Sequence, residues 1–177
     1  GTGVYGTGDG DMMNPMYMNI DTLGRYLVSE WDSTRYSSTK PGRVQIFNSD
    51  KSYFGSLYVP QASGIGIDGK TGKIYVCSAS ESKIYVFNQD YSLYGTFGQF
   101  GIGNDPGFFF APLDIEVDED SNLYIADYRN NRVAVHDGNF DYITSFGSFG
   151  GGNDNMIYPD AIAKSGSKLF VPEWCND

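Results

Sequence analysis

The fold is decided by one stretch, PLDIEVDEDSNLYIADYRNNRVAVHDGNFDYITSFG, at residues 112–147. It contains four short runs rich in β-branched and aromatic residues, separated by the Asp, Asn and Gly residues that favour tight turns. Short turns join neighbouring strands in an antiparallel sheet, so the stretch predicts a four-stranded antiparallel unit. The predicted strands are 113–117, 122–126, 132–136 and 140–146.

The same unit recurs along the chain. A unit begins at each of Pro15, Pro60, Pro112 and Pro159, at intervals of 45, 52 and 47 residues. The connection FGQFGIGND at 97–105 returns as FGSFGGGND with two of nine positions changed. The runs YLV, IYV and LYI are apolar at every position, as expected for sheets that are covered on both faces. Four antiparallel strands every 45–50 residues are typical of a β-propeller blade.

We therefore expect an all-β protein, a single β-propeller segment over residues 1–177 with an incomplete ring. Residues 3–15 align with 147–159, so the two ends are expected to be parts of different blades in a longer array. Open blade edges then predict association with other copies or with further blades of a longer chain. The expected parts are a blade tail at 1–14, blades at 15–59, 60–111 and 112–158, and the first half of a blade at 159–177.

The repeat resembles the NHL repeat over almost the whole chain. This resemblance implies a parent ring of about six blades, within the range known for propellers. It implies little about function, because this fold hosts scaffolds, RNA binders and several enzymes. The matching positions are clearest in one unit: Gly98, Phe100, Gly101, Pro112, Ile115, Val117, Asp118, Asn122, Tyr124, Ala126, Asp127, Asn131, Arg132 and Val133.

Composition excludes several classes of partner. The formal charge of −10 repels phosphate backbones, so no nucleic-acid partner is expected. No apolar run is long enough for a membrane span. The acidic balance, few lysines and many Tyr, Asn, Ser and Gly residues predict an extracellular or cell-surface protein. Cys77 and Cys175 lack metal-ligand spacing, and two buried thiols are preferred over a disulfide.

Carboxylates recur where the first strand of a unit ends. Asp21, Asp68 and Asp118 occupy this place in three units. In DEDSN, at 118–122, Asp118 and Asp120 are weak candidates for calcium ligands. A short carboxylate in a turn also accepts backbone N–H groups, and repetition in every unit favours this structural role.

An acid followed by an aromatic residue recurs where the second strand ends. The pairs are Glu30-Trp31, Asp127-Tyr128 and Glu173-Trp174, whereas the second unit has Ser78-Ala79. The third strand begins with Arg43, Lys83 or Arg132, which predicts an ion pair across the hairpin worth about 0.2–1 kcal/mol if exposed. The aromatic residues could also form a binding rim, and the two roles are compatible.

The first unit has twelve residues, WDSTRYSSTKPG at 31–42, between its second and third strands, where the second and third units have four, so it carries an insertion of eight residues. Surface loops carry function more often than cores do, although a plain solvated loop is the preferred interpretation. The candidates for the binding rim are Trp31, Asp32, Arg35, Tyr128, Arg129 and Trp174.

No catalytic residue is assigned. His136 is the only histidine, which is too few for a histidine zinc site and gives no convincing Ser-His-Asp set. Polar residues on the predicted inner strands could hold calcium in a lactonase-type propeller, but are expected to line a wet channel: Asn19, Asp114, Glu116 and Asp160.

The sequence thus predicts a non-catalytic binding or scaffold module. Its partners would be another protein, or copies of itself joined through blade edges, with no cofactor. The alternative is a segment of a propeller enzyme, either a calcium-dependent, lactonase-like hydrolase or a lyase, whose site lies mostly in blades outside this sequence.

Overall fold

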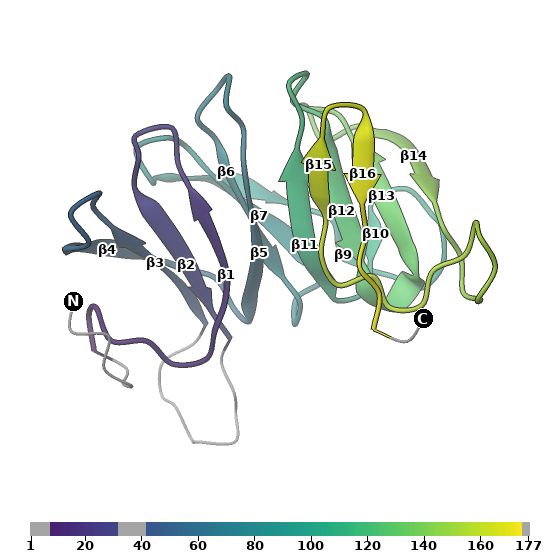
Figure 1. The fold of residues 1–177 in the computed structure, drawn as a ribbon, viewed down its shortest axis with the longest axis horizontal. Helices are drawn as coiled ribbons and strands as arrows, with labels where there is room; N and C mark the ends of the chain where they lie inside the picture. The colour runs from purple at the N-terminus through teal and green to yellow at the C-terminus, as the bar shows by residue number, and fades with distance from the viewer. Residues whose placement is uncertain (1–7, 32–41, 175–177) are drawn as a thin grey trace.

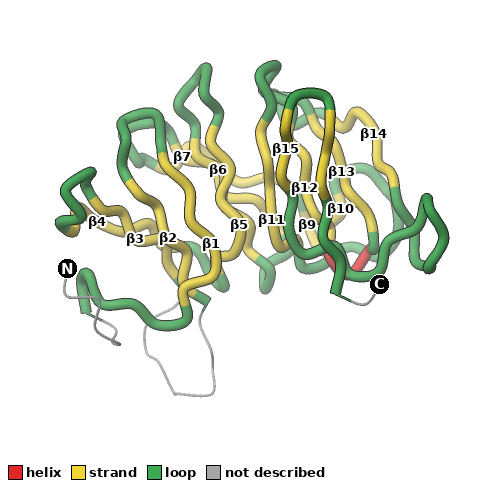
Figure 2. Tube along the Cα trace, in the orientation of Figure 1, coloured by secondary structure: helices red, strands yellow, loops and turns green. Residues whose placement is uncertain are grey.

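The computed structural model of the chain describes residues 8–31 and 42–174. Three four-stranded antiparallel sheets follow one another, with strands in chain order within each sheet, and a two-stranded hairpin comes last (Figures 1 and 2). The all-β prediction with four-stranded antiparallel blades is confirmed. The first blade comprises β1 (Pro15–Ile20), β2 (Tyr26–Glu30), β3 (Arg43–Phe47) and β4 (Tyr53–Tyr58). The second blade comprises β5 (Ala62–Ile67), β6 (Ile74–Ser78), β7 (Lys83–Phe87) and β8 (Leu93–Phe97).

The third blade and the C-terminal hairpin repeat this plan. The YRNN turn between the second and third strands of the third blade is a short 3-10 helix, η2 (Tyr128–Asn130), after which Asn131 takes a left-handed conformation. The third blade comprises β11 (Pro112–Val117), β12 (Leu123–Asp127), β13 (Arg132–His136) and β14 (Tyr142–Phe146). The C-terminal hairpin comprises β15 (Ala163–Ser165) and β16 (Lys168–Phe170).

Carboxylates shape the turns of the blades. Asp21 Oδ1 accepts the N–H groups of Leu23 and Arg25, each at 2.9 Å. Asp118 Oδ1 accepts those of Asp120 and Asn122, at 2.9 and 2.8 Å. A short side chain that reaches its own backbone in this way holds the chain in a turn.

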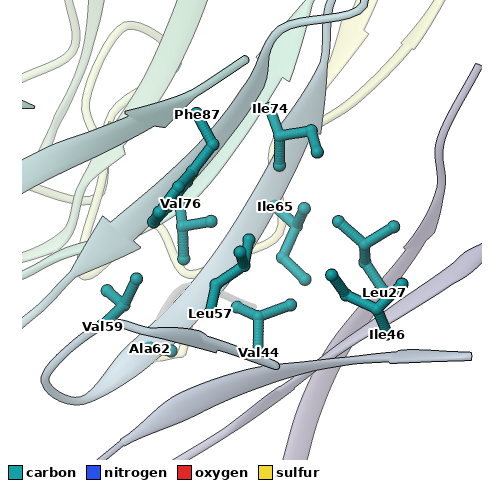
Figure 3. Packing of buried hydrophobic residues seen from close by; sticks show 10 residues of the cluster. All are labelled: Leu27, Val44, Ile46, Leu57, Val59, Ala62, Ile65, Ile74, Val76 and Phe87. Atoms are coloured by element: carbon teal, nitrogen blue, oxygen red, sulfur yellow. The ribbon is translucent and has the colours of Figure 1, made fainter. Parts of the chain in front are cut away.

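The core lies between the blades. In β6, Ile74 and Val76 pack toward the first blade, whereas Tyr75 and Cys77 pack toward the third. A middle strand is therefore covered on both faces, which is why its sequence is apolar at successive positions. Figure 3 shows the cluster between the first and second blades. Full burial of each Val, Leu or Ile side chain contributes roughly 1.5–3 kcal/mol.

The connections between blades differ in length and structure. Between the second and third blades, β9 (Gln99–Phe100) pairs in parallel with β10 (Phe108–Phe109), a ladder that the sequence did not predict. A parallel β-bridge between Phe149 and Met156 forms a similar contact in the connection that precedes the C-terminal hairpin. Between the first and second blades only residues 59–61 connect β4 to β5.

Some predicted features fall on residues that the structure does not describe. These are the strand around Val4, most of the insertion with Asp32 and Arg35, and Cys175. Cys77 is a buried free thiol, and burial raises its pKa. Over the described ranges, no helix is long and apolar enough to cross a membrane.

Candidate functional site

A cavity of about 860 Å³ lies where the first strands of the units begin and the second strands end. Four of the six predicted rim residues line it, namely Trp31, Tyr128, Arg129 and Trp174, and they come from three different units. Asp32 and Arg35 lie outside the described residues. The rest of the lining is Asn14, Pro15, Met16, Tyr17, Gln61, Ala79, Phe110, Ala111, Leu113 and Asp160. We call this space the axial cavity, because each of the four units contributes residues that lie in its first strand or shortly before it.

The aromatic side chains of the axial cavity are accessible. Trp174 is 70% exposed, and Trp31 and Tyr128 are half-buried. The ring of Tyr128 stacks on that of Tyr158 with centroids 4.9 Å apart. Rings held in this way offer a flat apolar surface to a ligand, and Arg129 brings a positive charge to it.

Each rim aromatic residue follows an acid. Glu30 and Asp127 are buried, whereas Glu173 is partly exposed. Arg43 Nε lies 2.5 Å from Glu30 Oε2, and Arg132 Nε lies 2.9 Å from Asp127 Oδ2. The side chains of Arg132 and Asp127 are almost fully inaccessible to water. The predicted hairpin ion pairs are present, and the energy of about 0.2–1 kcal/mol for an exposed pair does not apply to them. Breaking a buried pair costs more, because it leaves an uncompensated charge.

The ion pairs are buried because the incoming connection folds over them. In the third blade, Arg132 Nη2 donates to Phe108 O at 2.7 Å, and the Phe110 N–H donates to Asp127 Oδ1 at 2.7 Å. These contacts join the connection to the hairpin that carries Tyr128. We call each acid, with its arginine where one is present, a connection clamp.

The other clamps repeat this geometry. In the first blade, Arg43 Nη2 donates to Asp11 O at 3.0 Å, and Glu30 Oε1 accepts the Met13 N–H at 2.9 Å. In the last unit, Glu173 Oε2 accepts the Ile157 N–H at 2.7 Å. The clamps thus fix the backbone beside the three rim aromatic residues.

The second blade lacks a clamp because it has no long connection to hold. Ser78 Oγ donates instead to Pro60 O at 2.6 Å. Lys83 lies 3.9 Å from Glu81, and both side chains are partly exposed. The sequence contained a signal for the missing clamp of the second blade. The acid at the end of the second strand, and the arginine that pairs with it, occur only in units that follow a glycine-rich connection.

Tyr17 links the first blade to the last unit at the axial cavity. Its hydroxyl donates to the backbone carbonyl of Asp160. Burial raises the pKa of Tyr17, and the nearby carboxylates of Asp114 and Asp160 raise it further. The phenol therefore keeps its proton and acts as a hydrogen-bond donor at neutral pH.

Asp114 lies next to Tyr17 but is buried, so the prediction that it lines a wet channel is wrong. Its Oδ1 accepts the Ile115 N–H at 2.9 Å, and its Oδ2 accepts the Ile162 N–H at 2.8 Å. The second contact joins the third blade to the last unit. Burial raises the pKa of Asp114 to about 7, although the two N–H groups act in the opposite direction.

Two further polar residues predicted on inner strands have different surroundings. Asn19 Nδ2 donates to Ile65 O at 2.8 Å, which joins β1 to β5. Glu116 is partly buried, and this burial raises its pKa. Neither residue lines the axial cavity.

In the part of the chain that the structure describes, the side chains that could coordinate a metal ion do not lie close together. Within 8–31 and 42–174, no three His, Cys, Asp or Glu side chains come together to hold one. Asp118 Oδ2 accepts hydrogen bonds from Asn122 Nδ2 and the Tyr124 hydroxyl, each at 3.1 Å. These contacts match the turn-capping role, and calcium binding by Asp118 and Asp120 stays a prediction.

His136 has a structural place on β13. It is buried, with Nδ1 3.0 Å from Phe140 O, and the rings of Phe97, Phe109 and Tyr142 surround it. Burial lowers its pKa, so the neutral imidazole is favoured. It does not line the axial cavity.

No protein family model and no curated protein matches the sequence, so the resemblance to NHL repeats is not confirmed. Solved structures do match. A gluconolactonase from Xanthomonas campestris has a TM-score of 0.66 at 13% identity, over 91% of this chain and 55% of its own. Virginiamycin B lyase from Staphylococcus aureus has a TM-score of 0.65 at 17% identity, over 90% of this chain and 49% of its own.

A third match is hydrazine synthase from Kuenenia stuttgartiensis, with a TM-score of 0.63 at 16% identity, over 91% of this chain and 41% of its own. The chain thus spans about half the length of the structures it resembles. All three are enzymes by name, and they give no support to the predicted non-catalytic scaffold. At these identities the likeness shows the fold alone, and the chain has the fold of a β-propeller segment.

Proposed function

We propose that this chain is part of a propeller enzyme that binds and converts a small organic molecule in the axial cavity. The observation that carries the proposal is the convergence of residues from all four units on one space of about 860 Å³. Cavities of about 300–1,000 Å³ with mostly apolar walls and a few polar groups are typical of small-molecule sites.

Polar groups in the wall of the axial cavity and directly behind it suit the opening of a lactone ring. Hydrolysis adds water across the ester: a C–O bond forms at the acyl carbon, the ring C–O bond breaks, and the leaving oxygen takes up a proton. A carboxyl group whose pKa is about 7 can give or take a proton at neutral pH, and Asp114 has this property. Asp114 is buried and does not itself line the axial cavity, so it would act through its neighbour Tyr17, which does. The likeness to a gluconolactonase makes a sugar lactone the first substrate to test.

Ring opening releases an acid, so proton release during incubation with gluconolactone follows the reaction. We expect the chain to accelerate the ring opening of gluconolactone above the uncatalysed rate. If Asp114 is the acid–base group, Asp114→Asn should lower the turnover number by about 10²-fold or more. The exposed Asp120 provides the matched control, because Asp120→Asn leaves the axial cavity untouched.

Two results would count against the proposal. Equal rates with and without protein, for gluconolactone and for virginiamycin B, would remove the enzymatic function. Equal loss of activity in Asp114→Asn and Asp120→Asn would remove the assignment of Asp114.

A further inference from the structure

Among the described residues, the axial cavity has one positively charged wall residue, Arg129. It lies in η2, directly after the rim residue Tyr128. Its backbone is fixed, because its N–H donates to Phe110 O at 3.1 Å and its carbonyl accepts Asn131 Nδ2 at 3.3 Å. The side chain is exposed, and its Cζ lies 5.3 Å from the centroid of the Phe110 ring. The positive charge is therefore held beside an aromatic part of the cavity wall.

The other described arginines have partners within the chain. Arg43 and Arg132 belong to connection clamps, and Arg25 Nη1 donates to the Tyr91 hydroxyl at 3.1 Å. Within 8–31 and 42–174, no carboxylate lies within 4.0 Å of the Arg129 guanidinium. A guanidinium has five N–H donors, so Arg129 is available to bind an anion in the cavity.

Arg129 is not part of the repeated framework of the units. The residue at this place is Asp32 in the first unit, Ser80 in the second and Cys175 in the last. The acids of the connection clamps, in contrast, recur in three of the four units, as a role in folding requires. The cation is thus a feature of one side of the cavity and not of the fold.

The wall beside this charge suits a flat ring. Phe110, Tyr128 and Trp174 line the same cavity, and aromatic side chains pack well on other flat rings. A guanidinium binds a carboxylate through two parallel N–H···O bonds. We propose that the axial cavity recognises a flat organic ring that carries a carboxylate, with Arg129 bound to the carboxylate and the rim aromatic residues packed on the ring.

This inference rests on the proposed function and narrows its substrate class. Arg129 becomes the residue that selects acidic lactones or esters over neutral ones. A neutral lactone such as gluconolactone should therefore bind more weakly than an acidic one of similar size, because it leaves the Arg129 charge without a partner.

Benzoate and benzamide test the proposal, because they have nearly the same shape and differ in charge. Tryptophan emission follows the binding of each compound to the chain, since both tryptophans line the cavity. We expect the Kd of benzoate to be lower than that of benzamide by about tenfold or more. Added salt should weaken the binding of benzoate and leave that of benzamide unchanged.

Variants of Arg129 show whether this residue causes the preference. Arg129→Gln should raise the Kd of benzoate by about tenfold and leave that of benzamide unchanged. Arg129→Lys keeps the charge but loses the planar fork, so part of the preference should remain. Lys168→Gln is the matched control, because it removes an exposed cation on β16 that does not line the axial cavity.

Equal Kd values of benzoate and benzamide for the wild-type chain would overturn the proposal, as would a preference for benzoate that persists in Arg129→Gln. Gluconolactone separates this failure from failure of the proposed function. If gluconolactone changes the emission and benzoate does not, the small-molecule site stands and the selection of anions by Arg129 is refuted. If neither compound changes the emission, both proposals are contradicted.

Discussion

At the scale of single residues, buried carboxylates connect parts of the chain that are distant in sequence. Asp127 holds the incoming connection and Arg132, and Asp114 holds the N–H of Ile162 in the next unit. The sequence indicated an acid and a cation on one hairpin, because hairpin partners follow from strand register. It could not predict their burial, which depends on a glycine-rich connection folding over them.

Removal of Arg132 should destabilise the protein far more than removal of the equivalent Lys83. Arg132→Leu leaves the Asp127 carboxylate buried without its cation, at a cost of about 3–5 kcal/mol in the free energy of unfolding. Lys83→Leu breaks a partly exposed pair and should cost below about 1 kcal/mol. Urea unfolding curves measure the loss in free energy of unfolding for both variants. Equal losses would contradict the stabilising role of the connection clamp.

Asp114 should make stability depend on pH. Its pKa rises from 3.8 in the unfolded chain to about 7 in the folded one, so between these values the folded state binds more protons than the unfolded state. Its stabilising contribution is complete below pH 3.8 and is lost as the pH rises through about 7, at roughly 1.4 kcal/mol per pKa unit.

Asp114→Asn should remove the contribution of Asp114 to this pH dependence. The free energy of unfolding of the variant should then change less with pH than that of the wild type. Urea unfolding at a series of pH values compares the two proteins, with Asp120→Asn as the control for an exposed carboxylate. If the free energy of unfolding changed with pH in the same way for the wild type and for Asp114→Asn, Asp114 would have the same pKa in the folded and unfolded states.

At the scale of elements, the strands could be predicted and the connections could not. Alternate residues of β6 pack on opposite neighbours, and this double burial gives the apolar runs from which the strands were predicted. The ladder of β9 and β10 is two residues long in each strand, too short for a periodic pattern. Its formation depends on a close approach of Gly98 to Phe109.

Gly98→Ala should destabilise the connection and Gly95→Ala should not. Gly98 has φ +86°, and an added Cβ would lie 2.4 Å from the Phe109 ring. The left-handed conformation alone costs about 1–2 kcal/mol with a side chain. Gly95, on β8, has ordinary φ and nothing within 4 Å of an added Cβ. Thermal unfolding should show a lower midpoint for Gly98→Ala only, and equal midpoints would refute the close approach.

At the scale of the whole molecule, repetition brings the rim residues together. Trp31, Tyr128 and Trp174 are distant in sequence but occupy the same place in their units, and the stacking of units carries them to one cavity. The shared position could be predicted from the repeat, as could the inner strands. The cavity itself could not, because its walls include Tyr17 and Asp160, whose contact follows from the arrangement of the blades.

The axial cavity as a small-molecule site is the central claim, and tryptophan fluorescence tests it most directly. The chain has two tryptophans, and both line the cavity, so their emission reports on this space without background from other sites. Titration of the wild-type chain with gluconolactone should give a saturable change in emission, and Tyr128→Ala should weaken the apparent affinity. Emission unchanged by both gluconolactone and virginiamycin B, at concentrations up to their solubility, would contradict the claim.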